Sequence, residues 1–166
     1  MKKIKQIKAK KSLVLLAALC LVCLIVMVLA LTLGRKTVVN FEPPPFDSAA
    51  LAGTPSNVEN ESYGPLDATA YSFSVCGRPT VEDGAALLWL TNPKSNEVWL
   101  KARILDTAGN ILGESGLLRP GEYVQAVALT TPPTEDKEAT LLIMSYEPTT
   151  YHSMGNVTLH TTLVYK

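Results

Sequence analysis

The sequence predicts an all-β protein that has a single N-terminal transmembrane helix and a C-terminal sandwich of seven antiparallel strands. Three observations support this fold class. An uncharged apolar run follows a lysine-rich start, a proline-rich segment follows that run, and from Ala70 onward short strand-like stretches alternate with turn residues. No strong amphipathic helix competes in this last part. The 166 residues therefore divide into 1–11, 12–34, 35–69 and 70–166.

Residues 12–34 are predicted to cross a membrane as a helix. The run from Ser12 to Leu33 contains no charge, proline or glycine, and about 20 apolar residues match the ~30 Å hydrocarbon core of a bilayer. Only Arg35 and Lys36 follow the run closely. The basic tail before it contains Lys2, Lys3, Lys5, Lys8, Lys10 and Lys11. This asymmetry predicts a cytoplasmic N-terminus, an extracellular C-terminal domain, and membrane lipid as the partner of the helix in the cell membrane.

A cleavable signal peptide is the alternative interpretation of this segment. The apolar region of a signal peptide is usually about 7 to 15 residues long and ends in small residues. Val28-Leu29-Ala30 offers such a context, with cleavage after Ala30. The product would then be a secreted β-sandwich protein. We expect an uncleaved anchor, because the apolar run is longer than a signal peptide requires.

Residues 35–69 have the composition of a flexible, proline-rich tether. They include a proline triplet at 43–45 among Ser, Asn, Glu and Gly, with little apolar periodicity. One piece differs, since Phe46 and the apolar residues at 49–51 surround Asp47, a residue that can cap a helical turn. The pattern suggests that this piece docks on the domain.

Charge is divided unevenly along the chain, although its formal net charge is zero. All 15 acidic residues but only nine of the 15 basic residues follow the apolar run, so this outer part has a net charge of −6. Binding to nucleic acid needs clustered basic residues on one face. Nucleic acid is therefore not expected as a partner.

The predicted strands are separated by turn chemistry. Gly77-Arg78-Pro79, Asn92–Asn96, Asp106–Asn110 and Arg119-Pro120-Gly121 each contain residues that favour turns, and Thr131–Glu138 is a polar connection. The expected strands are Ala70–Val75, Ala85–Thr91, Glu97–Asp106, Ile111–Leu117, Glu122–Thr130, Ala139–Glu147 and Asn156–Tyr165.

The five-residue loop at 92–96 also predicts a register for the strands on either side of it. It places Thr91 opposite Glu97, so that Leu90 faces Val98 and Leu88 faces Leu100. These apolar residues share one side of the pleat and continue along the strand toward the core. The core-facing stripe consists of Leu88, Leu90, Val98, Leu100, Ala102 and Ile104.

The opposite side of this hairpin is the candidate partner surface. The register places Trp89 opposite Trp99, beside Lys101 and Arg103, with Glu114 on the next strand close to Arg103. Tryptophan, tyrosine and arginine supply much of the energy at interface centres.

Tyr151, in the long loop between the last two strands, is a second candidate contact, because loops often carry recognition on such scaffolds. The alternative is that the Phe46 piece or the first strand covers the indoles of Trp89 and Trp99. Cys76 is the only cysteine of the outer part and is expected in the core.

Residues Ala70–Lys166 resemble the bacterial immunoglobulin-like and fibronectin III-like sandwiches of exported proteins. The resemblance rests on the number of strands, on Leu118–Tyr123 before a strand, and on Asp106–Asn110 in a hairpin. The arrangement is also similar to small uncharacterised membrane-anchored proteins of Gram-positive bacteria. This resemblance implies a position on the outer face of the cytoplasmic membrane.

No catalytic, metal-binding or cofactor-binding set is predicted. The two histidines, His152 and His160, fall in a loop and a strand, so no shared element brings them together with Glu147. Ser153 beside His152 does not make a triad, which requires convergence in space. We expect a non-catalytic, membrane-tethered module of the cell envelope that binds a protein or glycan partner or acts as a scaffold. A structural subunit of an envelope assembly is the alternative.

Overall fold

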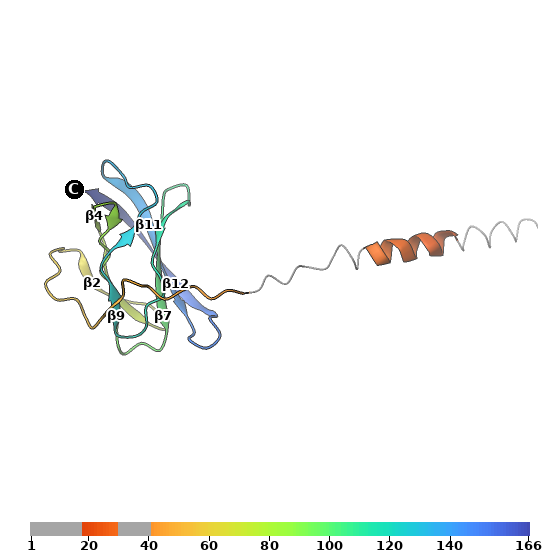
Figure 1. Cartoon of the computed structure of the whole chain (residues 1–166), viewed down its shortest axis with the longest axis horizontal. Coiled ribbons are helices and arrows are strands. Elements are labelled where there is room, and N and C mark those ends of the chain that lie inside the picture. Colours follow the sequence, from red (N-terminus) through yellow and green to blue (C-terminus); the bar gives the residue numbers. More distant parts are fainter. Residues whose placement is uncertain (1–17, 30–40) are drawn as a thin grey trace, which may run out of the picture. The chain divides into compact units, whose positions relative to one another are not determined.

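The computed structural model describes residues 18–29 and 41–166 (Figure 1). The chain divides into two compact units, 1–42 and 43–166. Residues 18–29 are helical with exposed side chains, and among the described residues no helix is both long and apolar enough to cross a membrane. The predicted basic tail and both ends of the predicted span at 12–34 lie outside the described residues. The transmembrane helix therefore stays a prediction.

Residues 43–166 form a β domain whose described part contains two sheets (Figure 1). One sheet has the strand order β1-β9-β6-β3-β2, and the other has the order β10-β5-β4-β12-β11-β7-β8. The strands are β1 (Leu51–Ala52), β2 (Tyr63–Asp67), β3 (Ser72–Cys76), β4 (Thr80–Glu82), β5 (Ala85–Ala86), β6 (Leu90–Asn92), β7 (Trp99–Leu105), β8 (Ile111–Glu114), β9 (Glu122–Val124), β10 (Val127–Ala128), β11 (Lys137–Tyr146) and β12 (Ser153–Tyr165).

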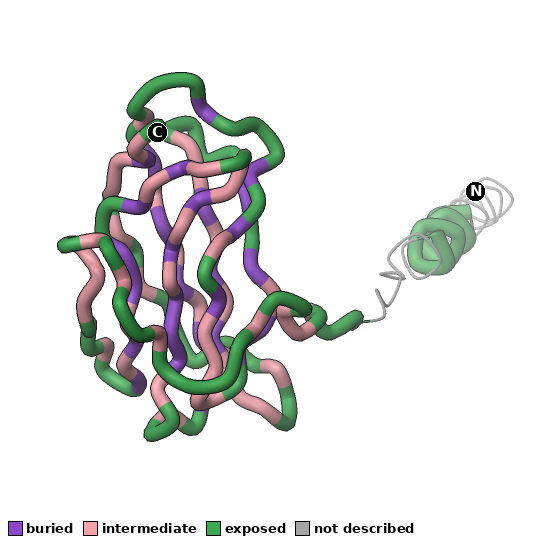
Figure 2. The backbone as a smooth tube through the Cα atoms, turned by 60° about the vertical axis from the view of Figure 1, so that its left-hand side comes forward, coloured by how far each residue is buried: buried purple, intermediate pink, exposed green. Residues whose placement is uncertain are grey.

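The core lies between the two sheets and follows the period of two that a pleated strand imposes. Buried residues alternate with less buried ones along β7 and β11, and Figure 2 shows buried positions interspersed with less buried ones along the strands of the domain. The predicted apolar stripe is confirmed, because all six of its residues are buried. Cys76 is also fully buried, and burial raises the pKa of its thiol to about 11. Its predicted place in the core is confirmed.

The predicted register across residues 92–96 is wrong, because the strands on either side belong to different sheets. β6 pairs with β3 and β9, whereas β7 pairs with β8 and β11. Trp99 consequently lies opposite Tyr146 and not opposite Trp89. The buried Asn92 stabilises this change of sheet, since its Nδ2 donates to the carbonyl oxygens of Val98 (2.9 Å) and Leu118 (3.0 Å).

Two predicted strands are each divided by a change of sheet. Ala85–Thr91 becomes β5 and β6, and Glu122–Thr130 becomes β9 and β10. The halves of the first predicted strand pair with the halves of the second, β5 with β10 in one sheet and β6 with β9 in the other. At the crossing point the Trp89 N–H donates to the Gln125 carbonyl oxygen at 3.0 Å. Apolar residues continue through both segments without a glycine or proline, so the sequence pattern did not mark the break.

The sheets also differ from the predicted seven antiparallel strands in other ways. β12 pairs with β4 in parallel. Within the predicted tether 35–69, β1 pairs with β9 and β2 pairs with β3, so the structure places residues 43–69 in the β domain. Pro65 lies in β2 at a sheet edge, a position that tolerates the missing N–H. The rest of the tether before residue 41 lies outside the described residues.

Candidate functional site

The structure separates the predicted partner surface into two places. Trp99, Lys101 and Arg103 occupy alternate positions of β7 that point away from the core. Trp89 lies between β5 and β6, and its indole stacks on Tyr123 with ring centroids 6.2 Å apart and an interplanar angle of 17°. The two tryptophans therefore do not form one surface.

Trp99 belongs to an aromatic cluster that consists of Phe46, Trp99 and Tyr151. The Trp99 ring makes edge contacts with Phe46 (centroids 4.8 Å apart) and Tyr151 (5.1 Å). The guanidinium carbon of Arg119 lies 3.5 Å from the centroid of the Phe46 ring. Tyr151 is thus brought to Trp99, although the sequence placed it on a separate surface. For Trp99 the alternative interpretation is correct: Phe46 packs against the indole and covers part of it.

Backbone hydrogen bonds hold Phe46 in this position. The Leu117 N–H donates to the Pro45 carbonyl (2.9 Å), and the Asp47 N–H donates to the Leu117 carbonyl (3.0 Å). The Asp47 carboxylate accepts from the N–H groups of Gly116 (2.7 Å) and Ala49 (2.9 Å). The predicted docking of this piece on the domain is confirmed, and Asp47 caps a single turn.

The two cations of β7 share one acidic partner. Oε2 of Glu114 lies 2.6 Å from Lys101 Nζ and 3.0 Å from Arg103 Nη2, and Glu114 lies opposite Arg103 in the sheet as predicted. Burial raises the pKa of Glu114, but the hydrogen bonds from Lys101 and Arg103 lower it, and the net shift is downward. One of the two positive charges expected for this surface is therefore offset.

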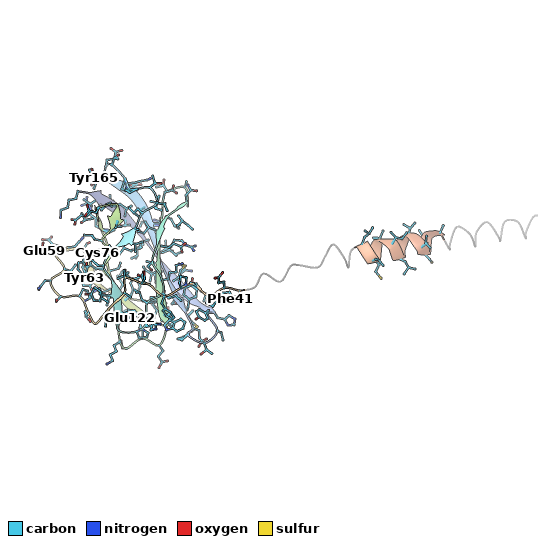
Figure 3. The ribbon with its side chains drawn as sticks, viewed as in Figure 1. Phe41, Glu59, Tyr63, Cys76, Glu122 and Tyr165 are labelled. Carbon is cyan, nitrogen blue, oxygen red and sulfur yellow. The ribbon has the colours of Figure 1, made fainter. Side chains whose placement is uncertain are left out.

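A pocket of about 260 Å³ lies beside Trp89. One wall comes from the loop between β1 and β2, and the rest comes from β4, the β5–β6 connection and Lys166. Figure 3 labels Glu59 on this loop, which leads into β2 and Tyr63. The lining residues that carry its chemistry are Asn57, Glu59, Asn60, Glu82, Trp89 and Lys166.

Some polar side chains of this pocket already bond other residues of the protein (engaged), and others do not (unengaged). Lys166 Nζ lies 2.8 Å from Glu82 Oε1, and this hydrogen bond raises the pKa of Lys166. Asn60 is engaged in the loop itself, where its Oδ1 accepts from the Ser62 N–H at 2.9 Å. Within the described chain, the side chains of Asn57 and Glu59 make no hydrogen bond or ion pair to another residue, although the charge of Glu59 also helps to raise the pKa of Lys166. An amide and a carboxylate therefore remain available to a ligand.

Trp89 itself has an unusual backbone conformation, with a φ of 51°. Large side chains rarely adopt positive φ, and such strain persists only where the surrounding structure enforces it. Here the stacking on Tyr123 and the bond from its N–H to Gln125 fix the residue at the crossing between the sheets. The indole is therefore held rigidly at the pocket.

The residues considered for catalysis have other roles in the structure. Glu147 Oε2 accepts from the N–H and the hydroxyl of Thr150, both at 2.6 Å, and these hydrogen bonds lower the pKa of Glu147 to about 2. His160 Nδ1 lies 3.5 Å from the Thr140 hydroxyl on the neighbouring strand. In the part of the chain that the structure describes, no group of three or more His, Cys, Asp and Glu residues is arranged to hold a metal ion.

Sequence reasoning missed the pocket, because Asn57 and Glu59 lie in a segment with no periodicity. Comparison with known proteins adds no further assignment: no protein-family model, curated protein or solved structure matches this chain.

Proposed function

We propose that this chain is a non-catalytic, membrane-tethered module on the outer side of the cell membrane, and that its immunoglobulin-like β domain binds a saccharide in the pocket beside Trp89. The observation that carries the proposal is the combination, in one pocket, of a rigid indole with an unengaged amide and an unengaged carboxylate.

The chemistry of a sugar ring matches this combination. A pyranose has an apolar C–H face, which packs on an aromatic ring, and a rim of hydroxyl groups, which needs hydrogen-bond acceptors and donors. Asn57 offers both kinds of group and Glu59 offers acceptors. The pocket has about 260 Å³, slightly below the ~300–1,000 Å³ of sites for drug-sized ligands, which suits a single ring. Glu59, Glu82 and Lys166 together have a net negative charge, which favours neutral or amino sugars over acidic ones.

The docked Phe46 limits how far the domain extends from a membrane anchor. Eight residues, 35–42, separate the predicted span from the compact unit that begins at Pro43. A fully extended chain of that length reaches at most about 30 Å. The saccharide that such a domain binds would therefore lie at or near the membrane surface.

Glu59→Gln is expected to weaken saccharide binding about tenfold or more. A hydrogen bond to a charged group is worth ~1.5–3 kcal/mol, and the substitution removes the charge but keeps the size. The full chain with Trp99→Phe retains Trp89 as its only tryptophan. This Trp99→Phe chain would first be applied to an array of glucose, glucosamine, N-acetylglucosamine and their disaccharides. The chain with and without Glu59→Gln would then be titrated with the sugar that binds most strongly, while the emission of Trp89 is followed.

Glu61→Gln is the matched control, since Glu61 is exposed on the same loop and does not line the pocket. We expect it to bind as the parent does. Binding to none of the sugars, or equal losses for the two variants, would contradict a saccharide site.

The anchor is expected to be retained, with the domain outside the cell. In a Gram-positive host, the full chain should stay with membranes after an alkaline carbonate wash and should have its full-length mass. External protease should digest the domain and spare an N-terminal epitope tag, whereas a control chain that starts at residue 35 should remain soluble. A mature mass that begins after Ala30 would instead support the secreted form.

A further inference from the structure

The first part of β12 is an unpaired edge of the seven-stranded sheet. On one side β12 pairs with β11 over almost its whole length. On the other side, within the described chain, it pairs only with β4, through Val164 opposite Thr80 and Tyr165 opposite Val81. The residues from Ser153 to His160 are exposed or only half-buried. A length of strand is therefore left open to solvent on one side.

The backbone groups that face this open side can be identified from one hydrogen bond. The Val164 N–H donates to the Pro79 carbonyl at 2.9 Å, away from β11. The backbone groups of a strand alternate between its two neighbours. The pairing with β11 is regular between Gly155 and Leu163, so the N–H and C=O groups of Asn156, Thr158 and His160 point to the open side.

Beyond a bulge at Met154, near its start, this edge lacks the features that usually protect an exposed strand. Native edges carry charges, prolines or bulges, or are covered, because an open edge pairs with other chains. β12 contains no Asp, Glu, Lys, Arg or Pro. By contrast, β2 contains Pro65 and Asp67, and the Leu112 carbonyl of β8 accepts from the Thr130 N–H at 2.7 Å. The unprotected edge of β12 thus suits a partner strand.

We propose that two copies of this chain pair antiparallel through β12 and join their seven-stranded sheets into one. The same strand can lie against itself without repulsion because it is uncharged. With Thr158 opposite the second copy's Thr158, Val157 lies opposite the second copy's Leu159, and both are half-buried apolar residues. In this register the outward-pointing groups of Asn156 meet those of the second copy's His160. The interface is isologous, as a two-fold dimer requires.

Thr158→Cys tests this register. In full-length protein with Cys20→Ser and Cys23→Ser, we expect mild oxidation to give a disulfide-linked dimer, since residues opposite each other on antiparallel strands have Cα atoms ~5.5 Å apart, within disulfide range. Cys76 is buried and does not compete. Ser95→Cys, in the exposed loop at 92–96, is the matched control and should link poorly. Equal yields for the two variants would contradict the register.

Charge at Thr158 distinguishes this interface from association through the anchor. Thr158→Lys and Thr158→Glu should each be monomeric when purified alone in detergent, whereas an equal mixture should recover the dimer, as measured by analytical ultracentrifugation. Both variants should keep the parent's circular dichroism, because Thr158 is exposed and no described strand uses its outward N–H. A monomeric parent, or dimers of either variant alone, would overturn the proposal.

Discussion

Asn92→Ala is expected to lower the free energy of unfolding by about 2–4 kcal/mol. The Asn92 side chain is fully buried and donates to the carbonyls of Val98 and Leu118, while its Oδ1 accepts from Asn96 Nδ2 at 2.7 Å. The Leu118 carbonyl keeps a second donor, the Leu100 N–H. Asn96 Nδ2 keeps its bond to the Ser72 carbonyl (2.6 Å), whereas the buried Val98 carbonyl loses its partner. A buried group left unsatisfied costs ~1–3 kcal/mol, and each of the other two lost hydrogen bonds contributes ~0.5–1.5 kcal/mol.

Urea denaturation of the full chain would measure this loss as a lower midpoint at an unchanged slope. Asn110→Ala is the matched control, because the Asn110 side chain, like that of Asn92, bonds another side chain, that of Asp106, but lies in an exposed turn. Its loss should be below about 1 kcal/mol. Similar losses for the two variants would show that Asn92 does not stabilise the change of sheet.

The sequence predicted best where alternation and turn chemistry agree. β7, β11 and β12 lie within the predicted segments or extend them by a few residues, and each has a clear apolar side. The glycines of two predicted turns have the positive φ that those turns require, 86° at Gly109 and 81° at Gly121. Local patterns of this kind depend only on neighbouring residues, so one sequence is sufficient to recognise them.

The sequence failed where the fold depends on contacts between distant residues. The change of sheet at Trp89 depends on Gln125 and Tyr123, which have no local signal near Trp89. The composition of β1 and β2 is typical of a linker. They form strands because β1 pairs with β9 and β2 pairs with β3 at the two edges of the five-stranded sheet.

The candidate site was predicted in part for the same reason. Trp99, Lys101 and Arg103 share a strand, so their common side followed from the pleat. The sequence could not predict that Phe46 packs on Trp99, that Lys101 pairs with Glu114, or that a pocket lies beside Trp89, because these contacts depend on the tertiary structure.

Gly116→Ala is expected to detach the segment around Phe46 and to lower the free energy of unfolding by about 2–4 kcal/mol. A Cβ at residue 116 would overlap the backbone of Phe46 and Asp47, and backbone atoms cannot give way as a flexible side chain does. The hydrogen bonds from Leu117 and Gly116 to this segment would be lost together with the packing of Phe46 on Trp99. Each hydrogen bond contributes ~0.5–1.5 kcal/mol and the aromatic contact ~0.5–1.5 kcal/mol.

The fluorescence of Trp99 separates this effect from a general loss of stability. In a chain with Trp89→Phe, Gly116→Ala should shift the emission of Trp99 to longer wavelength and increase its quenching by acrylamide, because its indole becomes wetter. Phe46→Ala should give the same shift with a smaller loss of stability, since it removes the ring and leaves the backbone in place. Gly64→Ala is the control, because a Cβ there meets no atom within 4 Å and its φ is not positive. If Trp99 emission were the same in all three variants, Phe46 would not shield the indole, and the domain would begin at β1. The connection to the anchor would then lengthen by the residues up to Ala50, and the argument for a domain held close to the membrane would lose its main support.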